Sequence, residues 1–218
     1  MNTSIERLQH WLEAHLPDLR EDLSPGCSEA ALDAFEALIG RPLPECLKAL
    51  YRTHDGQGCE VNTGPFFGLT FLSLAQARAH WQSWNDIIDA WTPEDRDEAS
   101  AFSRSATPGA IKPLYANRYW IPFAYDYGGN YLGVDLDPDT QGTVGQVINF
   151  GRDEDEKYVL ADSFGAFLTW LVEQLEGGQF VLREEDDGGM SLNTRTPATF
   201  HFLDAVASLF AVAPGKPA

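Results

Sequence analysis

The fold is decided by residues 120–150, which read WIPFAYDYGGNYLGVDLDPDTQGTVGQVINF. Short runs of apolar and aromatic residues alternate there with turn residues, a pattern typical of consecutive β-strands joined by tight turns. The Gly-Gly-Asn sequence at 128–130 suits a hairpin turn, because glycine adopts positive φ at little steric cost. The pattern predicts strands near Trp120–Tyr125, Tyr131–Asp135 and Val144–Phe150. The stretch contains no nucleophile motif, metal-binding box or nucleotide-binding loop.

Helical periodicity and capping residues occur on both sides of this strand-rich centre. The predicted helices begin at Thr3, near Ser28, at Pro44, after Ser73, at Thr92, at Asp162 or Ser163, and at Thr196-Pro197. Further strands are predicted at Phe66–Leu72, Ile111–Tyr115 and Phe180–Arg183, and a surface loop at Ala99–Gly109. This order favours an α+β class and one domain over residues 1–218, with additional helices at both ends.

Composition limits the kinds of partner. The chain has 218 residues, of which 44% are hydrophobic, and a formal charge of −18. Such a charge repels nucleic acid and anionic membranes, whereas it speeds the encounter with a basic protein. Three cysteines without a CxxC spacing, Cys27, Cys46 and Cys59, predict a reduced intracellular protein. With no signal-like N-terminus and no apolar stretch of membrane-spanning length, we expect a cytoplasmic location.

Four segments, taken together in this order, resemble the SUKH superfamily, which includes the Smi/Knr-type cell-wall-assembly regulators of fungi. These segments are Leu43–Tyr51 followed by Asp55-Gly56; Trp120–Ala124 with Asp126 and Gly128-Gly129-Asn130; Leu132–Asp137; and Gly145–Ile148 leading through an acidic loop to Val159–Phe164. The likeness covers about residues 28–178 and leaves a C-terminal extension at 179–218. It implies a twisted, largely antiparallel sheet packed against helices.

The resemblance also carries expectations about function. Bacterial members of the superfamily are commonly immunity proteins that bind and neutralise toxins, and other members are regulatory scaffolds. The family has no general catalytic set, so none is transferred to this chain.

Residue patterns for metal or cofactor chemistry are weak in this sequence. Asp135, Asp137 and Asp139 have the opening spacing of a calcium loop, but Thr140 stands where glycine is needed and Gln146 where a bidentate glutamate is needed. The five histidines are scattered without a ligand box. The sequence therefore predicts no metal and no cofactor.

Two acidic and aromatic stretches are candidates for partner binding. The run Asp153, Glu154, Asp155 and Glu156 is either a solvated loop or a docking surface for a basic partner. Asp126, Tyr127 and Asn130 form a rim that is typical of a recognition patch and equally of a well-packed hairpin. Three tryptophans on one predicted helix, Trp81, Trp84 and Trp91, belong either to the core or to an interface.

The leading hypothesis is a non-enzymatic protein-binding module, specifically an immunity protein that occludes a basic toxin domain. Its predicted partner-binding residues are Asp126, Tyr127, Asn130, Asp153, Glu154, Asp155 and Glu156. The alternative is an intracellular regulatory or scaffold protein of the cell-wall-assembly-regulator type. A third hypothesis, a hydrolase, would use carboxylates such as Asp126 and Asp135.

Overall fold

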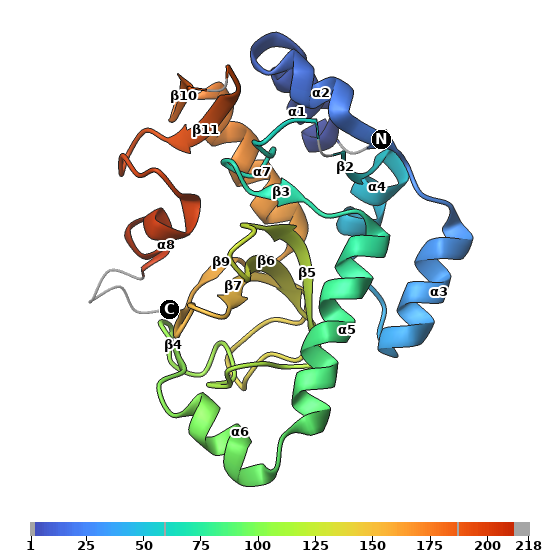
Figure 1. The fold of residues 1–218 in the computed structure, drawn as a ribbon, viewed down its shortest axis with the longest axis vertical. Coiled ribbons are helices and arrows are strands. Elements are labelled where there is room, and N and C mark those ends of the chain that lie inside the picture. Colours follow the sequence, from blue (N-terminus) through green and yellow to red (C-terminus); the bar gives the residue numbers. More distant parts are fainter. Residues whose placement is uncertain (1–2, 59, 187, 212–218) are drawn as a thin grey trace.

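The computed structural model describes residues 3–58, 60–186 and 188–211, so Cys59 lies outside the described residues. Figure 1 shows the arrangement of the helices and strands. The helices are α1 (Thr3–His15), α2 (Pro17–Asp22), α3 (Glu29–Ile39), α4 (Glu45–Thr53), α5 (Leu74–Ala90), α6 (Pro93–Ser100), α7 (Phe164–Glu176) and α8 (Phe202–Phe210). The strands are β1 (Leu23–Pro25), β2 (His54–Gln57), β3 (Thr70–Phe71), β4 (Arg104–Ser105), β5 (Trp120–Tyr125), β6 (Asn130–Asp135), β7 (Gln146–Gly151), β8 (Glu156–Lys157), β9 (Val159–Ala161), β10 (Phe180–Glu184) and β11 (Met190–Thr194).

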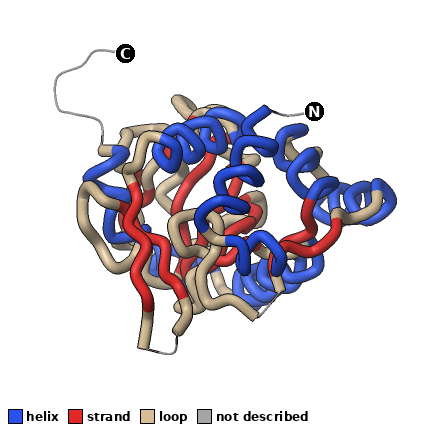
Figure 2. The backbone as a smooth tube through the Cα atoms, turned by 90° about the horizontal axis from the view of Figure 1, so that it is seen from above, coloured by secondary structure: helices blue, strands red, loops and turns tan. Residues whose placement is uncertain are grey.

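The central sheet has five strands in the order β3-β5-β6-β7-β9, and every neighbouring pair is antiparallel. Helices surround these strands (Figure 2). The α+β class and the three strands predicted within residues 120–150 are therefore confirmed. Ser73 caps α5 through a capping box, and Ser163 caps α7, as the sequence predicts.

One predicted strand is wrong and another is too long. Residues 111–115 form no strand, because Pro113 lacks a donor and the Tyr115 amide hydrogen-bonds to the Ser100 hydroxyl. Of Phe66–Leu72 only Thr70–Phe71 is a strand, since Gly64 and Gly68 exchange backbone hydrogen bonds in a tight turn before it.

Alternation along the strands separates two faces of the sheet. The inner face carries Phe123, Leu132 and Val134, which join the main hydrophobic core. The outer face carries Trp120, Tyr131, Ile148 and Phe150, which form a second, smaller core beside α5. Gly133 lies on this outer face, where an added Cβ would come within 2.5 Å of the Phe150 ring. Glycine at 133 thus leaves room for the aromatic rings to stack across the strands.

Helices cover the two faces differently. On the inner face, α7 buries Phe164 and Phe167 against Phe123, with ring centroids 5.1 and 5.8 Å apart. Helix α5 runs along the β5 side of the sheet (Figure 1) and buries Ala77 against the outer-face core. The outer-face residues of the sheet are buried, whereas Trp84 of α5, which packs against them, is partly exposed.

The C-terminal extension packs on the same core as the first helix. Strand β11, which the sequence did not predict, pairs antiparallel with β10. Helix α8 starts at Phe202, later than the predicted Thr196-Pro197, with the His201 ring accepting a hydrogen bond from the Leu203 amide. The Phe202 ring stacks on Phe67 at 5.3 Å.

Among the described helices, none has the length and apolar character needed to cross a membrane.

Candidate partner-binding surface

The turn between β5 and β6 is held by the Asp126 carboxylate. Its Oδ1 accepts hydrogen bonds from the amides of Gly128 at 2.7 Å and Asn130 at 2.9 Å. Asp126 therefore organises the turn as aspartate commonly does, by accepting from amides a few residues ahead. Tyr127 between them adopts a positive φ of 61° and leaves its side chain exposed, at 68%. Tyr127 is thus presented at the tip of the hairpin.

Asn130 connects this turn to the acidic loop that follows β7. Its side-chain amide donates to Asp126 at 2.8 Å and to Asp153 at 3.2 Å, and its Oδ1 accepts from the Asp153 amide at 2.8 Å. Asn130 is itself buried. The structure therefore brings Asp153 to Asp126 and Asn130 in one hydrogen-bonded corner, although Asp153 follows Asn130 by 23 residues in sequence.

The acidic run is not a uniform anionic surface. Glu154 turns inward, where its carboxylate accepts a hydrogen bond from Asn149, and burial raises its pKa to about 7. The neighbouring Lys157 is completely buried, which lowers its pKa to about 8. Both shifts arise because burial disfavours the charged form.

The other acids of the run differ in exposure. Glu156 accepts from the Arg104 guanidinium at 3.0 Å and the Tyr158 hydroxyl at 2.7 Å, and these bonds, that from Arg104 foremost, lower its pKa. Asp153 and Asp155 are exposed. Arg152 lies 3.7 Å from the Asp153 carboxylate and offsets part of its charge, so the charge that this loop offers to a partner comes from Asp155 and, in part, from Asp153.

An aromatic groove of about 340 Å³ adjoins this corner. We define the aromatic groove by its lining residues, Ser83, Trp84, Ile87, Trp91, Tyr115, Gly129, Tyr131 and Arg152. The Trp84 ring lies 5.7 Å from that of Tyr115 and 6.5 Å from that of Tyr131, and Trp91 lies 5.9 Å from Tyr115. Gly129 and Arg152 make the groove continuous with the hairpin and the acidic loop.

The groove joins features that the sequence indicated separately. Trp84 and Trp91 lie in it, whereas Trp81 is buried and donates its indole N–H to the Arg118 carbonyl at 2.7 Å. Ile87 and Tyr115 were not predicted as site residues. Helical spacing from Trp84 to Ile87 and Trp91 was the available signal for Ile87, while Tyr115 reaches the groove only through the tertiary fold.

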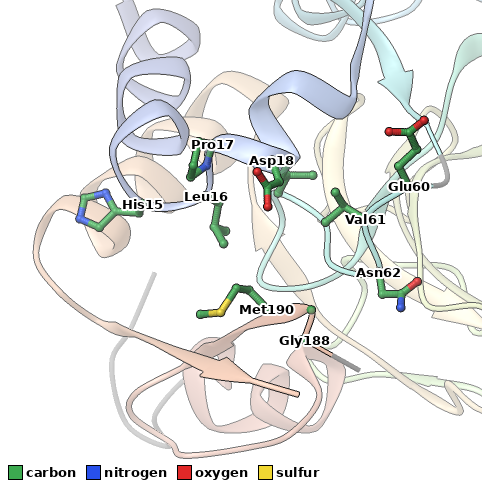
Figure 3. A pocket seen from close by; sticks show the side chains of 11 residues that line it. His15, Leu16, Pro17, Asp18, Glu60, Val61, Asn62, Gly188 and Met190 are labelled. Carbon is green, nitrogen blue, oxygen red and sulfur yellow. The ribbon is translucent and has the colours of Figure 1, made fainter. Parts of the chain in front are cut away.

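A second concavity, of about 320 Å³, lies between the α1–α2 junction and the β10–β11 hairpin. Figure 3 shows Asp18 and Glu60 on its wall, with Leu16 and Met190 facing it from the helical and hairpin sides. It lacks the clustered rings of the aromatic groove. The groove is therefore the stronger candidate for a protein-recognition surface.

The carboxylates of the hydrolase hypothesis do not converge. Asp126 follows the end of β5, whereas Asp135 pairs with Trp120 at its beginning, so the two lie at opposite ends of the hairpin. Asp135 is fully buried, which raises its pKa to about 6, and it accepts from the Gln146 amide and the Asp137 backbone. Its contacts are those of a strand-end structural residue. Within the described residues, no group of three or more His, Cys, Asp or Glu is placed to hold a metal ion.

Comparison with known proteins identifies the family. The sequence profile of the SMI1 / KNR4 family (SUKH-1) matches residues 26–170. The chain is 29% identical to the cell wall assembly regulator SMI1 of Saccharomyces cerevisiae, over 83% of this chain and 41% of that protein. It is 33% identical to the cell wall biosynthesis/cell cycle regulator smi1 of Schizosaccharomyces pombe, over 86% and 38%.

A third relative, the glucan synthesis regulatory protein of Neurospora crassa, is 31% identical over 84% of this chain and 40% of its own length. The chain thus spans about two-fifths of the length of these curated relatives. The region that the family profile matches, 26–170, contains the central sheet and the candidate surface. The chain belongs to the SMI1/KNR4 family (SUKH-1).

Proposed function

We propose that this chain is a non-enzymatic, regulatory protein-binding module whose partner docks in the aromatic groove. The observation that carries the proposal is the row of accessible Trp, Tyr and Ile side chains along that groove, beside an acidic corner. The names of its relatives, regulators of cell wall assembly and of glucan synthesis, support a regulatory role over a catalytic one.

The groove has the chemistry of an interface centre. Trp and Tyr supply much of the binding energy in protein complexes, because large rings lose water on contact while retaining a polar group. Ile87 adds an aliphatic surface that is 41% exposed. A partner segment with apolar side chains would bury these groups and gain the hydrophobic contribution.

The acidic residues beside the groove indicate which kind of residue the partner segment carries at one end. Asp153 and Asp155 are exposed beside the groove, and the chain carries a formal charge of −18. A Lys or Arg of the partner would be attracted to this end, which speeds association more than it strengthens the final complex. We therefore assign the occupant as a protein segment with apolar anchors and a basic residue next to Asp153. Tyr127 and Asn130 would contribute by contact and by fixing the corner, respectively.

The immunity-protein hypothesis proposes a different partner for the same surface. A basic toxin domain would also match the acidic corner, but the relatives' names favour the regulatory alternative. The two hypotheses differ in the identity of the protein that is bound. A cytoplasmic location remains a prediction from the sequence.

The test replaces Ile87 by aspartate and uses Leu38→Asp as the matched control. Both are aliphatic residues on helices, with exposures of 41% and 40%, but Leu38 lies on α3, away from the groove. Proteins retained by the wild type and the control but lost with Ile87→Asp are purified and titrated against all three chains. We expect affinity to fall at least about tenfold for Ile87→Asp alone. Equal affinity for all three chains would reject the groove as the binding site.

A further inference from the structure

A cavity of about 280 Å³ adjoins the aromatic groove, and Trp91 lines both. We call it the cationic pocket and define it by Trp91, Arg96, Lys112, Asn117, Arg118 and Asp137. Arg96 comes from α6, whereas Lys112 and Arg118 precede β5. The chain has 15 Lys and Arg against 33 Asp and Glu, so three cations in one cavity depart from its overall character.

Positive charge exceeds negative charge at this cavity. Lys112 Nζ lies 2.7 Å from the Asp137 carboxylate, which Arg41 also approaches to 3.6 Å, and Arg118 pairs with Asp89. Arg96 donates to the Ile88 carbonyl at 3.1 Å and forms no ion pair with any described residue. Among the residues that line the cavity, Arg96, Lys112 and Arg118 stand against the single carboxylate of Asp137, so its wall carries an excess of about two positive charges.

The carboxylates present there stay ionised. Partial burial acts to raise the pKa of Asp137, but hydrogen bonds from Lys112 and Asn117 outweigh it and leave the pKa below its usual value. The hydrogen bond from Arg118 lowers the pKa of Asp89. Asp137 and Asp89 are therefore both ionised near neutral pH, and the excess of positive charge on the cavity wall is counted with Asp137 charged.

We propose that the cationic pocket receives a phosphoryl group carried by the partner segment that docks in the aromatic groove. This inference rests on the proposed function. A phosphorylated side chain carries a charge of about −1.5 to −2 at neutral pH, which matches the local excess. Arginine N–H groups, as on Arg96, form short charge-assisted hydrogen bonds to phosphoryl oxygens.

The surroundings favour one phosphoryl group over a polyanion. Glu94, Asp97 and Glu98 on α6 are exposed near Arg96 and would repel a nucleic acid backbone or an anionic membrane. The apolar route beside the pocket favours a peptide, since Leu114 lines the pocket and the next residue, Tyr115, lines the groove. A segment lying along both would place its phosphoryl group beyond Trp91 and its basic residue near Asp153.

The experiment uses the full chain and two peptide libraries, one with a fixed phosphoserine or phosphothreonine among random positions and one with the unphosphorylated residue. Selected peptides are titrated while the indole signals of the tryptophans are followed by NMR, with inorganic phosphate as a separate probe. We expect phosphorylation to tighten binding about tenfold or more. The double variant Arg96→Gln/Lys112→Gln should lose that preference. Arg78→Gln is the matched control, because Arg78 is an exposed arginine on α5 that does not line the pocket.

Three results would overturn the inference. The inference is wrong if phosphorylation has no effect on affinity, if the double variant keeps the preference for phosphopeptides, or if inorganic phosphate binds as tightly as the best phosphopeptide. Unfolding curves of each variant verify the fold. A partner that is lost with Ile87→Asp but bound equally by Arg96→Gln/Lys112→Gln would reject the phosphoryl site while leaving the groove proposal intact. A partner indifferent to Ile87→Asp would reject the groove itself.

Discussion

The two faces of the central sheet are both aromatic, but their chemistry differs. On the inner face Phe66, Phe123, Phe164 and Phe167 contact one another and are almost completely buried. On the outer side Trp120, Tyr131 and Phe150 of the sheet are also buried, but Trp84, Trp91 and Tyr115 beside them remain partly exposed along the groove. Phenylalanine has no polar atom to satisfy, whereas Tyr and Trp keep one end in water. We therefore expect the inner cluster to stabilise the fold and the rings along the groove to serve recognition.

The largest effect should follow from breaking the inner cluster. Phe123→Ala removes a ring that lies 5.3 Å from Phe66 and 5.1 Å from Phe164. Because Phe164 is fixed on α7 and Phe66 is buried beside it, the cavity cannot collapse easily, and we expect a loss of about 3–5 kcal/mol in the free energy of unfolding. Urea unfolding followed by circular dichroism measures it. A loss below about 1 kcal/mol would mean that the inner cluster is not the main stabilising region.

Phe202→Ala tests whether the C-terminal extension belongs to the same cooperative unit. Phe202 is buried and stacks on Phe67, which also contacts Trp170 of α7. We expect unfolding to remain a single transition, with a loss of about 3 kcal/mol. This outcome would support the proposal that residues 1–218 form one domain. A separate early transition for the extension, at unchanged stability of the rest, would contradict that proposal.

Local sequence determined the strands but not the groove. Residues 120–150 form their hairpins through turn chemistry and alternation, which short windows of sequence contain. Strand β11 was missed because Met190–Thr194 lacks the β-branched and aromatic pattern, and its pairing with β10 supplies the order instead. Tertiary packing, not spacing, brings Trp84 to Tyr115 and Tyr131.

The acidic run illustrates the same limit. Sequence alone gives four adjacent acids and no reason to separate them. Asn149 on β7 donates a hydrogen bond to the buried Glu154 carboxylate, and Arg104 on β4 pairs with Glu156. Both partners arrive through the fold. The binding role of Asp126, Tyr127, Asn130 and the run at 153–156 therefore stays a prediction, with exposure concentrated at Tyr127, Asp153 and Asp155.

Glu154, in the loop between β7 and β8, provides a pH-dependent test. Its pKa is about 7 in the folded chain, against about 4.3 when unfolded, so the folded state binds the proton more tightly. Its contribution to stability is complete below about pH 4 and is lost as the pH rises through about 7. Glutamine cannot ionise, so Glu154→Gln should be more stable than the wild type at about pH 8 by on the order of 2 kcal/mol.

The comparison of Glu154→Gln with the wild type is made by urea unfolding at about pH 5, 6.5 and 8, where the difference should grow steadily. Asp155→Asn is the matched control, since it removes an exposed carboxylate next to Glu154. A stability difference for Glu154→Gln that is independent of pH would show that this carboxylate is not held in a buried environment.

The smallest effect on stability should come from the outer cluster, where the expected effect on binding is large. Trp84→Ala removes a half-buried ring whose neighbours are Tyr115 and Tyr131. We expect stability to fall by about 1 kcal/mol, while affinity for a partner purified by the Ile87 experiment falls about thirtyfold. Phe102→Ala is the control, because Phe102 is 76% exposed and lies outside the groove. If Trp84→Ala lost several kcal/mol of stability with unchanged affinity, the outer rings would be core residues like the inner ones, and the two faces would not differ in role.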